Sequence, residues 1–162
     1  PPIVQLKHQP IKPLAKFESS KIPIFGWIYR EAVIMVDRSN PDKRAESLRN
    51  LKKALLNNNS IFIFPEGTFS MTDQYPLKSF FSGAFKLAIE LKIPIQPVLL
   101  VDTVERMHFN SILTLTPGIS RVVYLETIQV EEYDLDQAEE LKQKVYNLMD
   151  QGLRRYRNYP PA

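Results

Sequence analysis

Residues 60–70 read Ser-Ile-Phe-Ile-Phe-Pro-Glu-Gly-Thr-Phe-Ser, an apolar run that leads directly into a polar turn. Four consecutive apolar residues, Ile61–Phe64, are bounded by turn formers, which favours a strand covered on both faces over an alternating edge strand. Pro65 has no backbone donor and therefore ends the strand, whereas Gly67 can adopt backbone angles closed to other residues. The stretch predicts a central strand that ends in a tight turn.

Glu66 is the charged residue of this turn. Open α/β sheets bind their ligands at the carboxyl ends of the strands, so a functional interpretation places Glu66 at a binding site. The alternative is a solvated glutamate in an ordinary turn, because carboxylates in loops are usually exposed. The residues alone leave both interpretations open.

Strand-like and helix-like segments alternate along the rest of the chain. Ser39-Asn40-Pro41 predicts a helix start, because a capping side chain precedes a proline, and Asp134 or Asp136 is expected to cap the last helix. Alternation implies crossover connections, so we expect an α/β fold with a mixed, largely parallel sheet and helices on both faces, in a single domain over residues 1–162. The predicted strands are 12–17, 32–36, 61–64, 94–101 and 120–129, and the predicted helices are 41–57, 82–91 and 136–157.

The composition limits the classes of site that the chain can carry. It has 162 residues, 44% of them hydrophobic, and no cysteine, which excludes disulfides, cysteine metal sites and thiol nucleophiles among these residues. A formal charge of +3 mildly favours anionic partners such as phosphates, coenzyme A or lipid head groups. No run approaches the roughly 18 consecutive apolar residues of a membrane-spanning helix.

Residues 18–30 form an aromatic, apolar stretch that includes Trp27 and Tyr29 and is flanked by Lys21 and Arg30. One interpretation is a short helix packed on the sheet, since large apolar residues at helical spacing are usually core. The other is an interfacial element, with the aromatic rings at head-group level and the basic residues on anionic lipid.

The pentapeptide Phe64-Pro65-Glu66-Gly67-Thr68 resembles the Phe-Pro-Glu-Gly-Thr signature of the glycerophospholipid acyltransferases, which include the 1-acyl-glycerol-3-phosphate acyltransferases. Further blocks are similar to this family in residue type, order and approximate spacing, and the resemblance covers roughly residues 12 to 101. These blocks are Lys16, Lys21–Trp27, Val33–Arg38, Gly83-Ala84 and Ile93–Val98.

The resemblance implies an enzyme of phospholipid biosynthesis. It would transfer a fatty acyl group from acyl-CoA or acyl carrier protein to a lysophospholipid, most simply 1-acyl-sn-glycerol-3-phosphate. These two are co-substrates, and no cofactor and no metal are implied. The resemblance further implies a membrane surface as partner, at the cytoplasmic face of the membrane, with the protein peripheral or anchored by segments outside this chain.

The family's catalytic His-x4-Asp pair is absent from these residues. His8 is followed five residues later by Pro13, and His108 by Leu113, so neither histidine has the required carboxylate. Family order places the pair immediately ahead of a segment like that which begins at Pro1. We therefore expect the catalytic histidine and aspartate before Pro1, in a domain that lacks its N-terminal portion here.

The resemblance assigns substrate binding to Lys16, Arg38, Glu66, Gly67 and Thr68. Arg38 would grip the acceptor phosphate with two parallel donors and Lys16 would add a point charge. Glu66 would position the acceptor hydroxyl or head group, and backbone donors near Gly67 and Thr68 would help to stabilise the oxyanion or place the acceptor.

The chain departs from the family pattern at Phe69, where many relatives have arginine. One positive contact to the phosphate is thereby lost. Either Lys78 or Lys86 replaces it, or the acceptor differs from ordinary lysophosphatidate.

Two other classes of function compete with the enzyme. A non-catalytic lipid- or phosphate-binding module would use Arg38 and Lys16 to hold a head group without a reacting base. Nucleic-acid binding through Arg154-Arg155-Tyr156-Arg157 is disfavoured, because charge at a helix end is usually solvated and suits the helix dipole, and no nucleic-acid motif accompanies it.

Overall fold

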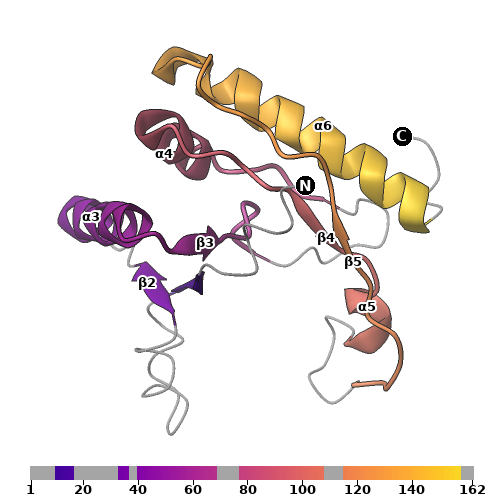
Figure 1. Ribbon diagram of the computed structural model, residues 1–162. Helices are drawn as coiled ribbons and strands as arrows, with labels where there is room; N and C mark the ends of the chain where they lie inside the picture. Colours follow the sequence, from indigo (N-terminus) through magenta and orange to yellow (C-terminus); the bar gives the residue numbers. More distant parts are fainter. Residues whose placement is uncertain (1–9, 17–32, 37–39, 69–76, 108–114, 158–162) are drawn as a thin grey trace, which may run out of the picture. The chain divides into compact units, whose positions relative to one another are not determined.

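The computed structural model describes residues 10–16, 33–36, 40–68, 77–107 and 115–157. The chain divides into two compact units, Pro1–Phe64 and Pro65–Ala162, which are called the first and second unit below. Figure 1 shows the helices and strands of both units. The aromatic stretch at residues 18–30, with its two interpretations, lies outside the described residues.

The first unit holds a three-stranded parallel sheet. Its strands are β1 (Ile11–Lys16), β2 (Ile34–Val36) and β3 (Ser60–Phe62), in the order β2-β1-β3. Lys16 pairs with Val36 in one register, and Ile11 pairs with Ser60 in the other. Because all pairs are parallel, the carboxyl ends of the three strands lie at one edge of the sheet.

β3 is shorter and less buried than its apolar sequence predicts. It ends at Phe62, Ile61 and Phe62 are half-buried, and Phe64 is 57% exposed. Phe62 and Phe64 instead pack edge to face, with ring centroids 5.0 Å apart. The expected central strand covered on both faces is therefore wrong in its burial and in its place, because β1 is the central strand of the described sheet and β3 lies at one end of the order. Its membership of a parallel sheet is confirmed.

The helix α3 (Pro41–Leu56) follows its sequence signals closely. The Asn40 side chain accepts the Lys43 backbone N–H at 2.9 Å, and Pro41 occupies the first turn, where its missing donor costs little. The helix contacts β2 and β3, and Leu51 is its buried leucine, whereas Leu48 is 40% exposed. The buried apolar face of the helix is therefore narrow.

The second unit is organised around α6 (Ala138–Arg157), which contacts α4 (Gly83–Leu91) and the strand β4 (Val98–Leu100). The periodic apolar residues of α6 belong to one core with residues from both partners. A methyl group at Gly152 of α6 would come within 2.8 Å of Leu99 Cδ1, so the helix lies close to β4. The core comprises Leu77, Phe80, Phe85, Ile89, Leu99, Val101, Ile128, Val130, Ala138, Leu141, Val145 and Leu153.

The start of the last helix confirms Asp134 as its cap. A short 3-10 turn, η2 (Leu135–Gln137), leads into α6, and Asp134 and Gln137 form a reciprocal capping box. The Gln137 side chain accepts the Asp134 backbone N–H at 2.9 Å. Acidic residues occupy the first turn of α6 and arginines the last turn, which suits the helix dipole.

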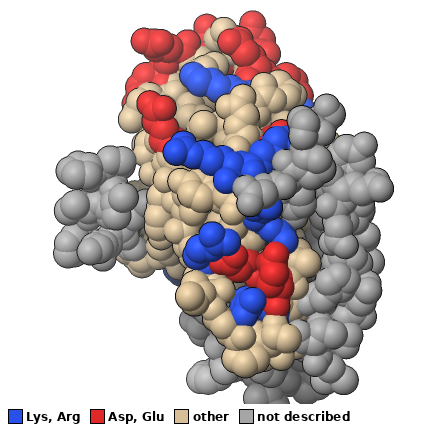
Figure 2. Space-filling view, turned by 90° about the vertical axis from the view of Figure 1, so that its right-hand side faces the viewer, with Lys and Arg blue, Asp and Glu red and all other residues tan. Residues whose placement is uncertain are grey.

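Acidic side chains gather on the surface around the start of α6. Figure 2 shows many Asp and Glu side chains at the top of the view, Lys and Arg side chains mostly below them, and a smaller acidic group among the basic side chains of the lower half. Around the start of α6 the exposed acidic residues are Glu131, Glu132, Asp134, Asp136, Glu139 and Glu140.

The last two predicted strands are much shorter in the structure. β4 pairs antiparallel with β5 (Val122–Tyr124). Beyond these strands, the Val101 N–H donates to the Arg121 carbonyl, the Leu125 N–H donates to the Pro97 carbonyl, and a bridge joins Ile95 and Ile128. Proline has no backbone donor at position 97, and the Gln96 side chain donates to the Leu125 carbonyl at 2.6 Å. A side chain thus replaces part of the ladder.

These elements confirm the α/β class: the first unit combines a helix with a parallel three-stranded sheet, and the second unit combines helices with an antiparallel pair of strands. The prediction of a single domain stays a prediction. In the part of the chain that the structure describes, no helix is both long and apolar enough to span a bilayer.

Candidate active-site turn

The turn after β3 depends on the backbone of Gly67. Residues 65–68 form consecutive turn and bend positions, and Gly67 has φ of 66°. This left-handed conformation is unfavourable for residues with a Cβ atom, so glycine is the residue that the turn requires. The turn places Glu66, Gly67 and Thr68 next to one another, with Thr68 exposed.

Two hydrogen bonds fasten this turn to the segment 77–81. The Lys78 backbone N–H donates to Glu66 Oε2 at 2.8 Å, and the Phe81 backbone N–H donates to the Pro65 carbonyl at 2.9 Å. The carboxylate of Glu66 is therefore held by the main chain of a segment twelve residues away. It is not the freely solvated glutamate of the alternative interpretation.

The environment of Glu66 alters its acidity. Its side chain is half-buried, and the desolvation raises the pKa of its carboxyl group. The Lys78 backbone hydrogen bond and the charge of the Lys78 ammonium group oppose this rise. Desolvation and the Lys78 contacts thus shift the pKa of this carboxyl group in opposite directions. In its charged form the carboxylate can accept a hydrogen bond from the hydroxyl group of a ligand.

Residues of α4 and α6 support the segment 77–81 from behind. The Tyr146 hydroxyl of α6 donates to the Leu77 carbonyl at 3.4 Å, and its ring meets the Phe80 ring edge to face with centroids 5.1 Å apart. Phe80 in turn stacks on Phe85. Tyr146 could not be identified from the sequence, because a contact across 69 residues leaves no local signal.

The other predicted substrate-binding residues are only partly placed. Lys16 is the last residue of β1, so its backbone lies at the carboxyl edge of the parallel sheet. Arg38 lies outside the described residues, as do Phe69 and both histidines. Of the two candidate replacement cations, Lys78 lies beside Glu66. Lys86 is exposed on α4, and its charge contributes to lowering the pKa of Glu139.

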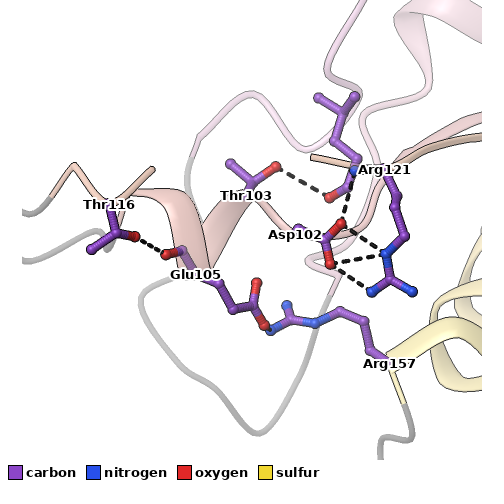
Figure 3. Close-up of polar contacts among 7 residues, drawn as sticks. Asp102, Thr103, Glu105, Thr116, Arg121 and Arg157 are labelled. Carbon is purple, nitrogen blue, oxygen red and sulfur yellow. Dashed lines mark hydrogen bonds and ion pairs between the residues drawn. The ribbon is translucent and has the colours of Figure 1, made fainter. Parts of the chain in front are cut away.

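A separate polar cluster holds the region around α5 (Thr103–Arg106), as Figure 3 shows. Arg121 pairs with Asp102 through two nitrogens, with Nη2–Oδ1 at 2.6 Å and Nε–Oδ2 at 2.8 Å. Its hydrogen bonds hold the pKa of Asp102 at about 2. Both carboxylates of the cluster are paired with arginines, Asp102 with Arg121 and Glu105 with Arg157, so its evident role is structural.

The same cluster engages the basic end of α6. Arg157 pairs with Glu105 (Figure 3), and Arg154 pairs with Asp150 at 2.7 Å. Arg155 lies over the Tyr156 ring, 6.0 Å from its centroid. These arginines therefore serve intramolecular contacts, which weakens the case for the Arg-Arg-Tyr-Arg run as a nucleic-acid site.

The geometry and the motif agree with a family match. Residues 3–101 match the family model described as Acyltransferase. The chain belongs to the acyltransferase family. The match includes the predicted blocks from Lys16 to Val98 and the turn at Glu66, so the resemblance stated from the sequence is confirmed.

Individual acyltransferases show the same relationship. The chain is 34% identical over 123 residues to a 1-acyl-sn-glycerol-3-phosphate acyltransferase of Cocos nucifera, covering 75% of this chain and 39% of the relative. It is 35% identical over 137 residues to the enzyme of that name from Escherichia coli, covering 82% and 53%. The chain thus spans about half the length, or less, of these acyltransferases.

The fold is also that of a solved acyltransferase. The crystal structure of the 1-acyl-sn-glycerophosphate (LPA) acyltransferase PlsC from Thermotoga maritima superposes with a TM-score of 0.73 at 24% identity. The superposition covers 93% of this chain and 58% of that one. It therefore extends past residue 101, where the family match ends, into the region of α6.

Proposed function

We propose that the protein transfers a fatty acyl group from acyl-CoA or acyl carrier protein to a lysophospholipid, most simply 1-acyl-sn-glycerol-3-phosphate. The observation that carries the proposal is the Phe-Pro-Glu-Gly-Thr turn, in which a half-buried carboxylate is held by a main-chain donor. The names of the similar acyltransferases supply the acceptor class.

The reaction requires a base and a place for negative charge. The acceptor hydroxyl oxygen attacks the thioester carbonyl carbon, the C–S bond breaks, and the hydroxyl proton finally protonates the departing thiolate. A histidine would carry that proton while an aspartate orients its ring. We propose that a His-x4-Asp pair of the full-length protein supplies these two groups, since neither His8 nor His108 has an aspartate at the required spacing.

The residues of this chain would bind and orient the acceptor. Glu66 accepts a hydrogen bond from the acceptor hydroxyl or head group, and backbone donors at Gly67 and Thr68 face the developing charge. Arg38 and Lys16 bind the phosphate. Lys78, whose ammonium group acts on Glu66, is the favoured substitute for the arginine that Phe69 replaces.

The setting that we propose is the membrane surface. The acceptor is a lipid, and the net charge of +3 favours an anionic lipid surface as partner. The protein would work at the cytoplasmic face, held peripherally or by segments outside this chain.

An assay of the full-length protein tests the proposal. Purified protein is incubated with acyl-CoA and 1-acyl-sn-glycerol-3-phosphate, and the release of free thiol is compared with the diacyl product found by mass spectrometry. We expect both in equal amounts. Binding of the lysophospholipid to vesicles or micelles without any product would instead support the non-catalytic binding module.

A further inference from the structure

One peptide group connects α6 to the carboxylate of Glu66. The bond between Leu77 and Lys78 carries the Leu77 carbonyl, which accepts the Tyr146 hydroxyl at 3.4 Å, and the Lys78 N–H, which donates to Glu66 Oε2 at 2.8 Å. Both contacts lie within the second unit. The hydroxyl and the carboxylate therefore bind opposite ends of a single planar dipole.

We propose that Tyr146 is a positioning residue for Glu66, acting through the Leu77–Lys78 peptide group. The inference rests on the proposed function, in which Glu66 orients the acceptor. It also gives α6, which lies outside the residues 3–101 of the family match, a role in positioning a residue of the site.

The physical basis is cooperative hydrogen bonding. A donor on a carbonyl oxygen polarises the peptide group, and the N–H of the same group becomes a stronger donor. Tyr146 thereby strengthens the contact that favours the charged form of Glu66. The Tyr146 contact is long for a hydroxyl donor, so we expect a modest effect.

The ring and the hydroxyl of Tyr146 have separable roles. The ring packs against Phe80 in the core, a role that phenylalanine would also fill. The hydroxyl lies among charged groups: Asp150 and Arg154 act on it from α6, and Glu66 acts on it from the turn. On the other side of Glu66, Lys78 contributes its backbone N–H and its charge.

The experiment follows the carboxyl group of Glu66 directly. The full-length protein is labelled with ¹³C-glutamate, and the Glu66 signal is identified by its loss in Glu66→Gln. Its titration is then compared between wild type, Tyr146→Phe and Tyr133→Phe. Tyr133 is the matched control, since its hydroxyl contacts Lys144 in an exposed position.

We expect the pKa of Glu66 to rise in Tyr146→Phe and to stay at the wild-type value in Tyr133→Phe. With lysophospholipid as acceptor, kcat/KM of Tyr146→Phe should fall by about two- to ten-fold, with the acid limb of its pH profile shifted to higher pH. An unchanged or lowered pKa in a natively folded Tyr146→Phe protein would overturn the proposal, as would an equal rise in Tyr133→Phe.

A second variant keeps the test decisive if Tyr146→Phe does not fold. Difluorotyrosine at position 146 keeps the ring and makes the hydroxyl a stronger donor, so the pKa of Glu66 should fall. A rise or no change in that protein would count against the relay. Both titrations are independent of turnover: if the wild type transfers no acyl group, the proposed function fails while the coupling of Tyr146 to Glu66 is still decided.

Discussion

The Lys78 backbone N–H donates a 2.8 Å hydrogen bond to Oε2 of Glu66. Glu66, the charged residue of the family signature, thus also holds a segment that lies twelve residues further along the chain. Substitution of Glu66 therefore has two separable consequences, one for the fold of the turn and one for the acceptor.

Glu66→Ala should lower turnover. The acceptor loses its positioning partner, and a misplacement of about 1 Å is enough to cost roughly 10²-fold in rate. The freed Lys78 N–H should also cost about 1 kcal/mol of unfolding free energy. Steady-state kinetics and urea denaturation measure the two effects.

Glu131→Ala is the control for Glu66→Ala. Its carboxylate likewise accepts a backbone N–H, that of Val130 at 3.0 Å, but outside the turn. We expect it to affect stability and leave kcat unchanged. A Glu66→Ala enzyme with wild-type kcat would remove Glu66 from the site.

Arg38→Ala should weaken use of the acceptor. Loss of a charge-assisted contact to phosphate is expected to raise the acceptor KM by about 10- to 100-fold with little change in kcat. Kinetics with varied acceptor at saturating acyl-CoA measure this. Arg49→Ala, on the exposed side of α3, is the control and should behave as wild type. Unchanged acceptor kinetics in Arg38→Ala would rule out its role in phosphate binding.

Lys78→Ala should also raise the acceptor KM, by about five-fold, because the cation beside Glu66 is lost while the backbone donor remains. Lys86→Ala removes an equal charge from the exposed face of α4 and should have no such effect. The same acceptor titration distinguishes them. If Lys86→Ala gave the larger change, the replacement cation would be Lys86.

Gly67→Ala should destabilise the protein by about 1–2 kcal/mol, because its φ of 66° is unfavourable for alanine. Gly83→Ala is the matched control: a Cβ atom there meets nothing within 4 Å and the residue begins α4. It should be neutral or stabilise by up to about 0.5 kcal/mol. Urea denaturation of both variants provides the comparison, and equal stabilities would show that the turn is not strained by a side chain.

The pairing of Asp102 with Arg121 should appear in the pH dependence of stability. Because the pKa of Asp102 is lowered from 3.8 to about 2, its contribution is present above the unfolded pKa and is lost as the pH falls through about 2. The difference in unfolding free energy between wild type and Asp102→Asn should therefore shrink as the pH falls from about 4 to about 2. In Arg121→Gln, NMR titration should find the pKa of Asp102 higher, and an unchanged value would exclude Arg121 as the cause.

Helices were more predictable from the sequence than strands. The bounds of α3 and the cap of α6 depend on neighbours such as Asn40, Pro41 and Asp134, whose signals are local. The strands expected at 94–101 and 120–129 have only three residues each in the structure. Their length depends on the partner strand and on the Gln96 side chain, which donates to the Leu125 carbonyl in place of a backbone N–H. An apolar run that contains or adjoins a proline therefore does not predict the length of a strand, because proline has no backbone donor for the pairing.

The candidate site divides in the same way. Glu66 and the left-handed Gly67 follow from a contiguous motif, so sequence alone could find them. The contact of Tyr146 with Leu77 joins residues 69 positions apart, and a tyrosine at helical spacing carries no mark of what its hydroxyl meets. Such a contact becomes visible only when the chain is folded.

The closeness of Gly152 to Leu99 has a practical bearing on how this protein can be dissected. Leu99 and Val101 are 2% and 1% exposed and share their core with α6, yet the match to the family model stops at residue 101. A truncation at residue 101 would remove α6 and expose both side chains to solvent, so we expect an insoluble product. Shortened versions for expression should therefore retain the chain at least to Arg157.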